Sequence, residues 1–219
     1  MMTRPSRRPT IIDLTATGLA SRLRLETQDL HRQSERSGFM AALLRGRLDR
    51  PGYAALLLNL QAIYAALEAG LARLTRASDI DFTPLHRSAA LGRDLQHLAA
   101  HAGGDDALRP ATRRYVQRLQ ALAGTDAPLL MAHAYVRYLG DLHGGQVLRQ
   151  RVSGLLGLTD TRGTSFYEFG PPEQVRHLIQ GFRAGLDAWP ADAAEADALV
   201  AEARLAFQLH IELFSQLPH

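Results

Sequence analysis

The sequence predicts an all-α fold in one domain. Apolar residues recur at helical spacing along the 219-residue chain, whereas alternation with a period of two is nearly absent. Aromatic residues make up only 6% of the chain, and Ala and Leu are abundant, which favours helices over strands. Pro and Gly divide the chain into segments of helical length. We therefore expect a single bundle of packed helices.

Proline and glycine mark where the expected helices begin and end. Proline is favoured in the first turn of a helix, because its missing N–H would have no partner there, and glycine is favoured just after the last turn. On these signals one helix starts at Asp49-Arg50-Pro51 and reaches Leu74. The other expected helices are 17–38, 39–45, 85–100, 109–122 and 126–156, one that starts near Pro171, and a last one from near Pro190 to Leu217. Segment 159–170 is the long irregular connection of the second half.

The composition excludes several kinds of site. The chain has no cysteine, so it has no disulfides and no metal centre held by thiolates. All 25 basic residues are arginine, and the net charge is only +3. Arginine stays protonated far above neutral pH, so it raises the isoelectric point to about 9.7 without a large field at pH 7. Acidic residues are mixed among the arginines, and we expect no nucleic-acid partner.

The first residues resemble a tail more than a targeting segment. Arg4, Arg7 and Arg8 are followed by no apolar segment of the kind that a signal peptide carries. No stretch approaches the ~20 uninterrupted apolar residues that span a bilayer. We expect a flexible tail at 1–16, one domain at 17–219, a cytoplasmic location and no contact with a membrane.

His31 lies on an unusual helix face. Its neighbours three, four and seven residues away are small or polar, where a core-facing stripe would carry Leu or Val: Thr27, Gln28, Ser34, Glu35 and Gly38. This face leaves room for something flat, with the imidazole projecting into it. A hydrogen bond from His31 Nδ1 to Glu35 would leave Nε2 free to bind a metal. The alternative is a surface histidine with an acidic neighbour one turn away.

A second unusual segment carries three glycines inside a strongly helical pattern, at 140, 144 and 145. Each costs about 1 kcal/mol relative to alanine in a helix interior. Such a loss is tolerated where backbone approaches a ligand closely or where a helix bends. Gly140 and Gly144 share one face, with Asp141 beside them and Arg137 one turn earlier. These charged neighbours favour a ligand-facing site over the alternative, a tight crossing of two helices.

Both segments resemble one family. The sequence Tyr-Val-Arg-Tyr-Leu-Gly-Asp-Leu-His-Gly-Gly-Gln-Val-Leu at 135–148 resembles the distal-helix signature of haem oxygenases. The sequence Leu-His-Arg-Gln-Ser-Glu-Arg-Ser-Gly-Phe-Met at 30–40 is similar to their proximal-histidine segment. Residues 206–214, which include Phe207, resemble the last helix of the family, and Phe207 is then expected to contact haem. Similarity in order and spacing runs over 21–217.

The resemblance implies a helical bundle with haem sandwiched between a proximal and a distal helix. His31 would be the axial ligand of the iron, with Glu35 as its hydrogen-bond partner. Gly140 and Gly144 would let the backbone of the distal helix lie against the porphyrin.

The resemblance also assigns the charged residues around the haem. Asp141, with Arg137, would anchor ordered water near the iron-bound oxygen. Arg24 and Tyr135 match positions expected to meet the haem propionates, and planar guanidinium groups suit carboxylates. A further propionate-binding arginine is expected on the penultimate helix, and we predict Arg183 for it.

The implied activity is the oxidative opening of haem to biliverdin. Haem would be both substrate and cofactor, with O₂ as the oxidant and with electrons from an external reductase or ferredoxin. The products would be biliverdin, expected as the α isomer, together with CO and ferrous iron, and the protein would act as a monomer. One alternative is a haem carrier or sensor without enzymatic activity. A di-iron bundle is disfavoured, because paired Glu-x-x-His motifs are absent.

The sequence departs from the family pattern at four positions. His143 occupies a position that is commonly Ser, and His210 one that is often Asn. Gln61 stands where some relatives carry a Tyr of the distal polar network. Gln180 falls at the expected propionate position of the penultimate helix, between Arg176 and Arg183. These changes affect the polar network and leave the main groups of the implied site in place.

Overall fold

The computed structural model describes residues 18–74, 79–99, 107–124 and 128–218. Within these ranges the regular elements are helices with no strand among them, and their buried side chains form one core. This confirms the all-α fold and the single domain. The expected tail at 1–16 lies outside the described residues, so it stays a prediction.

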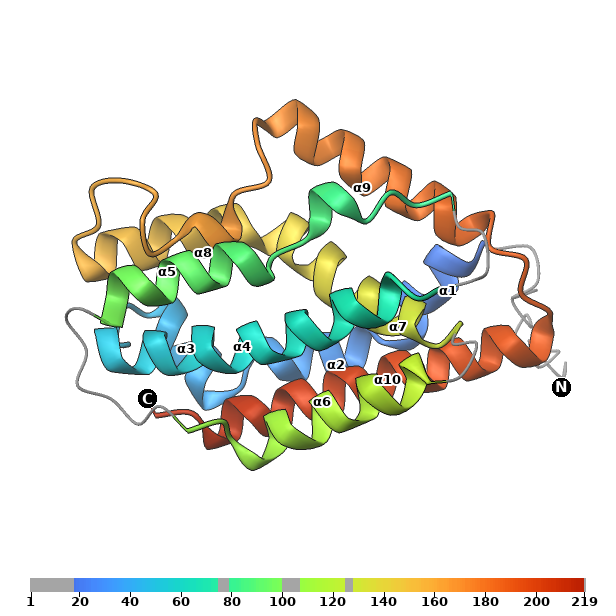
Figure 1. Ribbon diagram of the computed structural model, residues 1–219, viewed down its shortest axis with the longest axis horizontal. Coiled ribbons are helices and arrows are strands. Elements are labelled where there is room, and N and C mark those ends of the chain that lie inside the picture. Colours follow the sequence, from blue (N-terminus) through green and yellow to red (C-terminus); the bar gives the residue numbers. More distant parts are fainter. Residues whose placement is uncertain (1–17, 75–78, 100–106, 125–127, 219) are drawn as a thin grey trace, which may run out of the picture.

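The helices follow the expected order (Figure 1). In chain order they are α1 (Leu19–Glu26), α2 (Gln28–Glu35), α3 (Gly38–Leu44), α4 (Arg50–Leu71), α5 (Ser88–Ala99), α6 (Pro110–Ala123), α7 (Leu130–Ala134), α8 (Gly140–Leu156), α9 (Pro172–Asp187) and α10 (Ala193–Gln216). Short 3₁₀ turns lie at Thr83–Leu85 and Ser165–Tyr167, and a π-helical segment, η2, lies at Tyr135–Leu139.

The expected helix over 17–38 is wrong, because two breaks divide this part of the chain into α1, α2 and α3. At the first break, Thr27 leaves helical geometry with φ −112° and ψ 2°. Its buried Oγ1 donates to the Leu23 carbonyl at 2.7 Å, a local bond that competes with the helix. At the second break, Ser37 caps α3 by accepting a hydrogen bond from the backbone N–H of Met40. The breaks leave His31 on a helix of only eight residues.

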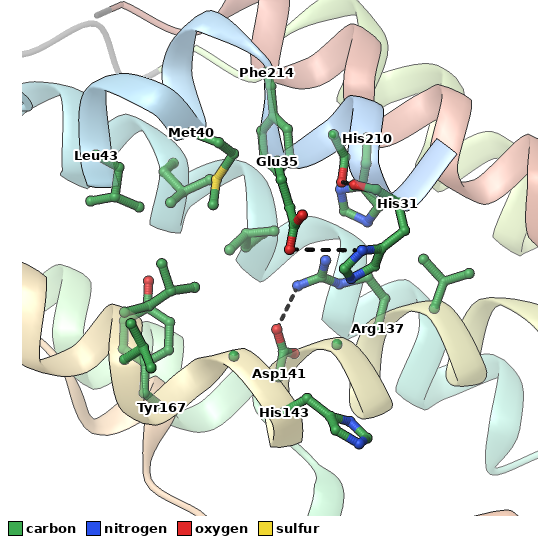
Figure 2. Close-up of a pocket in the computed structure, with 18 of the residues that line it drawn as sticks. His31, Glu35, Met40, Leu43, Arg137, Asp141, His143, Tyr167, His210 and Phe214 are labelled. Atoms are coloured by element: carbon green, nitrogen blue, oxygen red, sulfur yellow. Dashed lines mark hydrogen bonds and ion pairs between the residues drawn. The ribbon is translucent and has the colours of Figure 1, made fainter. Parts of the chain in front are cut away.

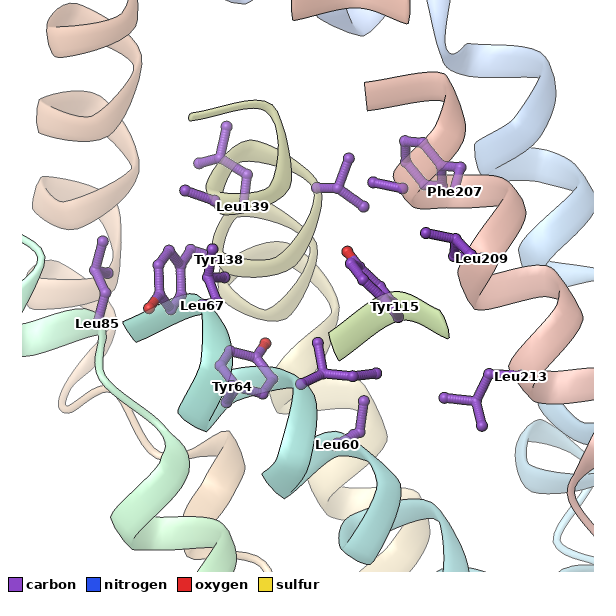
Figure 3. Packing of buried hydrophobic residues seen from close by; sticks show 14 of the residues in the cluster. Leu60, Tyr64, Leu67, Leu85, Tyr115, Tyr138, Leu139, Phe207, Leu209 and Leu213 are labelled. Carbon is purple, nitrogen blue, oxygen red and sulfur yellow. The ribbon is translucent and has the colours of Figure 1, made fainter. Parts of the chain in front are cut away.

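Helix α4 forms the centre of the bundle and packs against α5 and α6, while α6 packs in turn against α10 (Figure 1). Figure 3 shows how Leu60, Tyr64 and Leu67 of α4 enter the shared core. As expected, Asp49 caps this helix, accepting from the Gly52 N–H at 2.8 Å, and proline lies in the first turn. The helix ends at Leu71 rather than at Leu74, where the apolar pattern ends.

Length and composition alone would allow α4 to cross a membrane, since its 22 residues include an apolar window of mean hydropathy 1.4. Of that window, 56% is buried inside the fold. A helix that is apolar on most sides is also what the core of a bundle requires. The apolar composition of α4 is therefore explained by its packing in the core of the bundle.

The expected helix over 126–156 is one helical run with a change of winding. It starts as α7, passes through the π-helical η2, and continues as α8 to Leu156. π-helical turns are rare and occur often at functional sites. Gly157 ends the run with φ +64°, the left-handed conformation that glycine adopts without strain. Residues 125–127, where this helix was expected to start, lie outside the described residues.

Asp94 of α5 holds the irregular segment at 159–170 against the bundle. Its buried carboxylate accepts hydrogen bonds from the backbone N–H groups of Gly163, Ser165 and Phe166 at 2.8–3.0 Å, and from Ser165 Oγ at 2.7 Å. The segment thereby brings Tyr167 under α8. The last helix, α10, starts at Ala193 with Asp192 as its cap, slightly after the expected start near Pro190.

Candidate functional site

A cleft runs between the N-terminal helices and α8, with α10 forming its inner wall (Figure 2). One part is a cavity of about 410 Å³ with a mostly apolar lining that includes Leu56, Leu60 and Phe214. A second cavity of about 380 Å³ lies towards α1 and α9. The two are adjacent, because they share five lining residues: His31, Val136, Gly140, His143 and Phe207.

His31 projects into this cleft from α2, with 52% of its side chain exposed and its ring lining both cavities. Its Nδ1 lies 3.7 Å from Glu35 Oε1, within reach of an ion pair and beyond a hydrogen bond. On its other side the ring meets Phe207 of α10 edge-on, with ring centroids 5.9 Å apart. Phe207 thus supports the imidazole while itself lining the cleft.

The wall opposite His31 is bare backbone. A methyl group placed on Gly140 or on Gly144 would meet no other part of the chain within 4 Å. A methyl group on Gly145 would instead contact Tyr167 at 3.7 Å. Gly140 and Gly144 therefore face the open cleft, and Gly145 faces the segment packed beneath α8. This is a space for a ligand that approaches the helix more closely than side chains would allow.

A buried polar cluster lies beside the two glycines. Arg137 Nη2 donates to Asp141 Oδ1 at 3.0 Å (Figure 2). The Tyr64 hydroxyl donates to Asp141 Oδ2. Arg137 Nε also donates to the Tyr64 hydroxyl oxygen at 3.2 Å. Burial raises the pKa of Asp141 and lowers that of Arg137, and their ion pair opposes both shifts. Asp141 lines the cleft with its charge balanced by Arg137.

Tyr64 is a member of this cluster that sequence reasoning missed. Its spacing on α4 marked it as an apolar core position, and the tyrosine that some relatives carry in the distal polar network was matched to position 61, where this chain has Gln. Gln61 does not line either cavity, and its amide lies beside Gly92 of α5. The position one turn later, at Tyr64, supplies the hydroxyl to Asp141. Within the described residues, the tyrosine hydroxyl at Asp141 therefore comes from position 64 and not from position 61.

The outer part of the cleft is cationic. Arg24 of α1, Tyr135 of η2 and Arg183 of α9 line the second cavity together. Burial raises the pKa of Tyr135, and a hydrogen bond with Thr27 and the charges of Arg183 and Arg24 act to lower it. Within the described ranges, neither guanidinium has a carboxylate partner. Arg176 and Gln180 line neither cavity, so Arg183 is the arginine of α9 that reaches the cleft.

Two buried histidines lie behind the cleft. His210 of α10 lines the larger cavity, is only 2% exposed, and has no hydrogen-bond partner on either ring nitrogen among the described residues. Burial lowers its pKa well below the usual range.

His133 instead is paired, with Tyr115 Oη 3.1 Å from Nδ1 and Glu202 Oε1 2.8 Å from Nε2. Burial raises the pKa of Glu202, but hydrogen bonds from Arg118 and His133 bring it down to about 2.

The fold and the cleft define a class of helical proteins that hold a ligand between a histidine-bearing helix and a glycine-bearing helix. A sequence model of the family described as "Heme oxygenase" matches residues 17–216. The heme oxygenase 1 of Nostoc sp. is 34% identical over 206 residues, covering 92% of this chain and 87% of that protein. The chain therefore belongs to the heme oxygenase family of enzymes.

Solved structures agree with this assignment. The heme oxygenase of Leptospira interrogans has a TM-score of 0.85 at 35% identity, and the match covers 92% of this chain and all of that one. Heme oxygenase-1 of the cyanobacterium Synechocystis, solved in complex with heme, has a TM-score of 0.83 at 32% identity, covering 91% of this chain and 92% of that one.

Proposed function

We propose that this chain binds haem in the cleft and opens it to biliverdin, with release of CO and ferrous iron. The proposal rests on one observation, the arrangement of the two opposite walls of the cleft. The imidazole of His31 lies on one side of the cleft, and the bare backbone of Gly140 and Gly144 lies on the other. A flat macrocycle with a metal at its centre fits between an imidazole and an unobstructed helix surface. The relative from Synechocystis is known in complex with heme.

The lining of the cleft suits the rest of the haem molecule. Apolar side chains and Phe207 would pack against the faces of the porphyrin. Arg24, Tyr135 and Arg183 would meet its propionates, because guanidinium groups without a carboxylate partner are suited to bind carboxylates. His31 would ligate the iron through Nε2, with Glu35 near Nδ1 to favour the required tautomer. Bound haem supplies the iron that activates O₂ and the ring that is oxidised.

Within this site, Asp141 is the group that would hold water. Each carboxylate oxygen already accepts one hydrogen bond, from Arg137 or from Tyr64, and each retains a lone pair with no further donor among the described residues. Water bound there would be oriented by the carboxylate and could deliver a proton into the cleft. The ion pair with Arg137 keeps the carboxylate in its accepting form, and Tyr64 limits its rotation. The backbone of Gly140 and Gly144 would set the direction in which a ligand on the iron can lean.

We further propose that the protein is a soluble monomer of the cytoplasm and that a separate reductase or ferredoxin supplies the electrons. The expected product is the α isomer of biliverdin, as implied by the Gly-Asp-Leu-x-Gly-Gly segment at 140–145. Leu44 and Val147 are exposed apolar residues that line the cleft, so an edge of haem beside them would be accessible from solvent. An electron donor would approach haem at an exposed edge of this kind.

Aerobic turnover tests the proposal. The haem complex is incubated with ascorbate or with a reductase system, and the Soret band is followed while the bilin is identified by chromatography. Loss of the band together with biliverdin formation is the expected result. A haem complex that keeps its Soret band under these conditions would instead be a carrier or sensor, and a protein that forms no complex with haem would contradict the proposal at its first step.

A further inference from the structure

His143 and Arg183 meet at the cationic end of the cleft, and their contact defines the state of the imidazole. His143 Nδ1 lies 2.6 Å from the Leu139 carbonyl oxygen, which only accepts hydrogen bonds, so Nδ1 carries the proton. The other ring nitrogen, Nε2, lies 3.1 Å from Arg183 Nη2. A guanidinium only donates, so Nε2 must offer its lone pair. The ring is therefore neutral and accepts from Arg183.

The placement of His143 makes this contact relevant to the ligand. It lies on α8 between Gly140 and Gly144 in sequence and lines both cavities. Arg183 comes from α9, on the outer side of the second cavity. The hydrogen bond therefore ties the glycine-bearing helix to the arginine that faces the open end of the cleft.

Arg183 depends on this contact for its position. In the described part of the chain His143 is its hydrogen-bond partner, and no carboxylate lies within ion-pair reach of it. Long exposed side chains without such a contact sample many rotamers, which costs entropy when a ligand fixes them. One guanidinium N–H is engaged by His143, and the others remain available for a bidentate contact with a carboxylate.

We propose that His143 is a positioning residue that holds Arg183 at the mouth of the cleft, so that the guanidinium meets one propionate and fixes how the macrocycle is turned in its plane. This inference rests on the proposed binding of haem. The family pattern commonly places serine at this position, and a serine hydroxyl ends much closer to the backbone than the imidazole Nε2. His143 thus gives this chain a support for Arg183 that the shorter side chain would not reach.

The rate of haem release measures how the contact between His143 and Arg183 affects haem binding. The rate of transfer from the haem complex to an excess of a haem-scavenging globin is measured at pH 8 for the wild type, H143A, H143Q, R183Q and the double variant H143A/R183Q. We expect H143A and R183Q each to release haem about fivefold faster, as for loss of one exposed charged contact. The double variant should be no faster than R183Q alone, because both changes remove the same interaction.

Two further variants separate positioning from a general structural effect. H143Q should release haem at nearly the wild-type rate, because the amide oxygen of glutamine can accept from Arg183. H177A is the matched control, since His177 is an exposed histidine of α9 that lines neither cavity, and its release rate should equal that of the wild type. Effects of H143A and R183Q that multiply in the double variant would overturn the inference.

The ligand-free protein gives a readout that does not depend on haem. ¹⁵N relaxation of the Arg183 Nε–H group should show an ordered side chain in the wild type and in H143Q, and a mobile one in H143A. Equal mobility in the wild type and H143A would overturn the inference, even if haem binds as proposed. If the wild type binds no haem, the proposed function fails, and the relaxation data still decide whether His143 holds Arg183.

Discussion

Arg137 and Asp141 lie one helical turn apart across the junction between η2 and α8, with Nη2 3.0 Å from Oδ1. Both side chains are nearly buried, at 12% and 9% exposed. A buried ion pair contributes little to stability relative to apolar residues, because desolvation offsets the attraction. Its place beside Gly140 and Gly144 is consistent with the proposed role of Asp141 in the chemistry of the cleft.

Replacing Asp141 with Ala should separate haem binding from haem degradation. The variant keeps His31 and the glycine wall, so a Soret band of the wild-type kind is expected. It removes the acceptor for ordered water, and the rate of biliverdin formation should fall by about 10²-fold, as for loss of a positioned proton-transfer group. Y64F, which keeps the carboxylate and removes one of its donors, should have a smaller effect. Biliverdin formation at the wild-type rate in D141A would disprove the proposed role in anchoring water.

Much of the site could be predicted from local sequence, because it contains residues that are unfavourable in the middle of a helix. Three glycines in a helical pattern indicated a close approach of backbone, and the structure distinguishes them further. Gly140 and Gly144 face the cleft, whereas Gly145 packs near Tyr167, which reaches it from a segment about twenty residues later. No feature of the helical pattern itself encodes which long-range neighbour lies under which glycine.

Other features depended on contacts that spacing does not show. Thr27 is tolerated in helices, and spacing does not show its buried bond to the Leu23 carbonyl at the break between α1 and α2. Tyr64 has the periodicity of a core residue and packs as one, yet its hydroxyl meets Asp141, 77 residues away in sequence. The outlines of the helices follow from local rules, while the polar network depends on how the helices pack.

Replacing His31 with Ala should abolish the spectrum of a histidine-ligated haem. In the proposed site the ring would be the axial ligand of the iron. It also packs edge-on to Phe207, but it is half exposed, so the ligand-free fold should remain stable to within about 0.5 kcal/mol. Absorption spectra of ferric and ferrous haem complexes check the ligand, and urea denaturation of the ligand-free protein checks the fold. The exposed His177 gives the matched control, H177A, whose spectrum should match that of the wild type. An unchanged spectrum in H31A would assign the ligand to another residue.

Replacing Gly144 with Ala should stabilise the ligand-free protein and weaken haem binding. The new methyl group meets no other part of the chain, and alanine in a helix interior is favoured over glycine by about 1 kcal/mol. The same methyl group occupies the space in which haem would lie, so its affinity should fall. G154A is the matched control, because Gly154 lies on the same helix, also has free space, and lines neither cavity. It should stabilise the fold with haem affinity unchanged. Equal haem affinity in both variants would mean that Gly144 does not face the ligand.

Replacing His210 with Leu should reduce the loss of stability at acidic pH. Burial keeps the native imidazole neutral, since its pKa is lowered well below the usual range, whereas the unfolded chain takes up a proton near pH 6.5. Below that pH the unfolded state therefore binds more protons, and the free energy of unfolding falls as the pH falls, by up to about 1.4 kcal/mol per pH unit for this residue. Above it, neither state is protonated and the contribution is constant.

Urea denaturation of the ligand-free protein at pH 7.5, 6.5 and 5.5 checks this prediction. At pH 7.5 the His210→Leu variant should be at least as stable as the wild type, because leucine buries no unpaired ring nitrogen. At pH 5.5 its advantage should grow by about 1 kcal/mol. His133, whose pKa is also lowered by burial, leaves part of the slope in both proteins. Glu202 adds little here, because its native pKa of about 2 and the ordinary pKa of a glutamate, about 4.3, both lie below this range. The exposed His177 gives the control H177L, which should leave the slope unchanged. Parallel pH profiles for the wild type and the His210→Leu variant would mean that His210 takes up a proton as readily in the folded protein as in the unfolded chain, which contradicts the prediction.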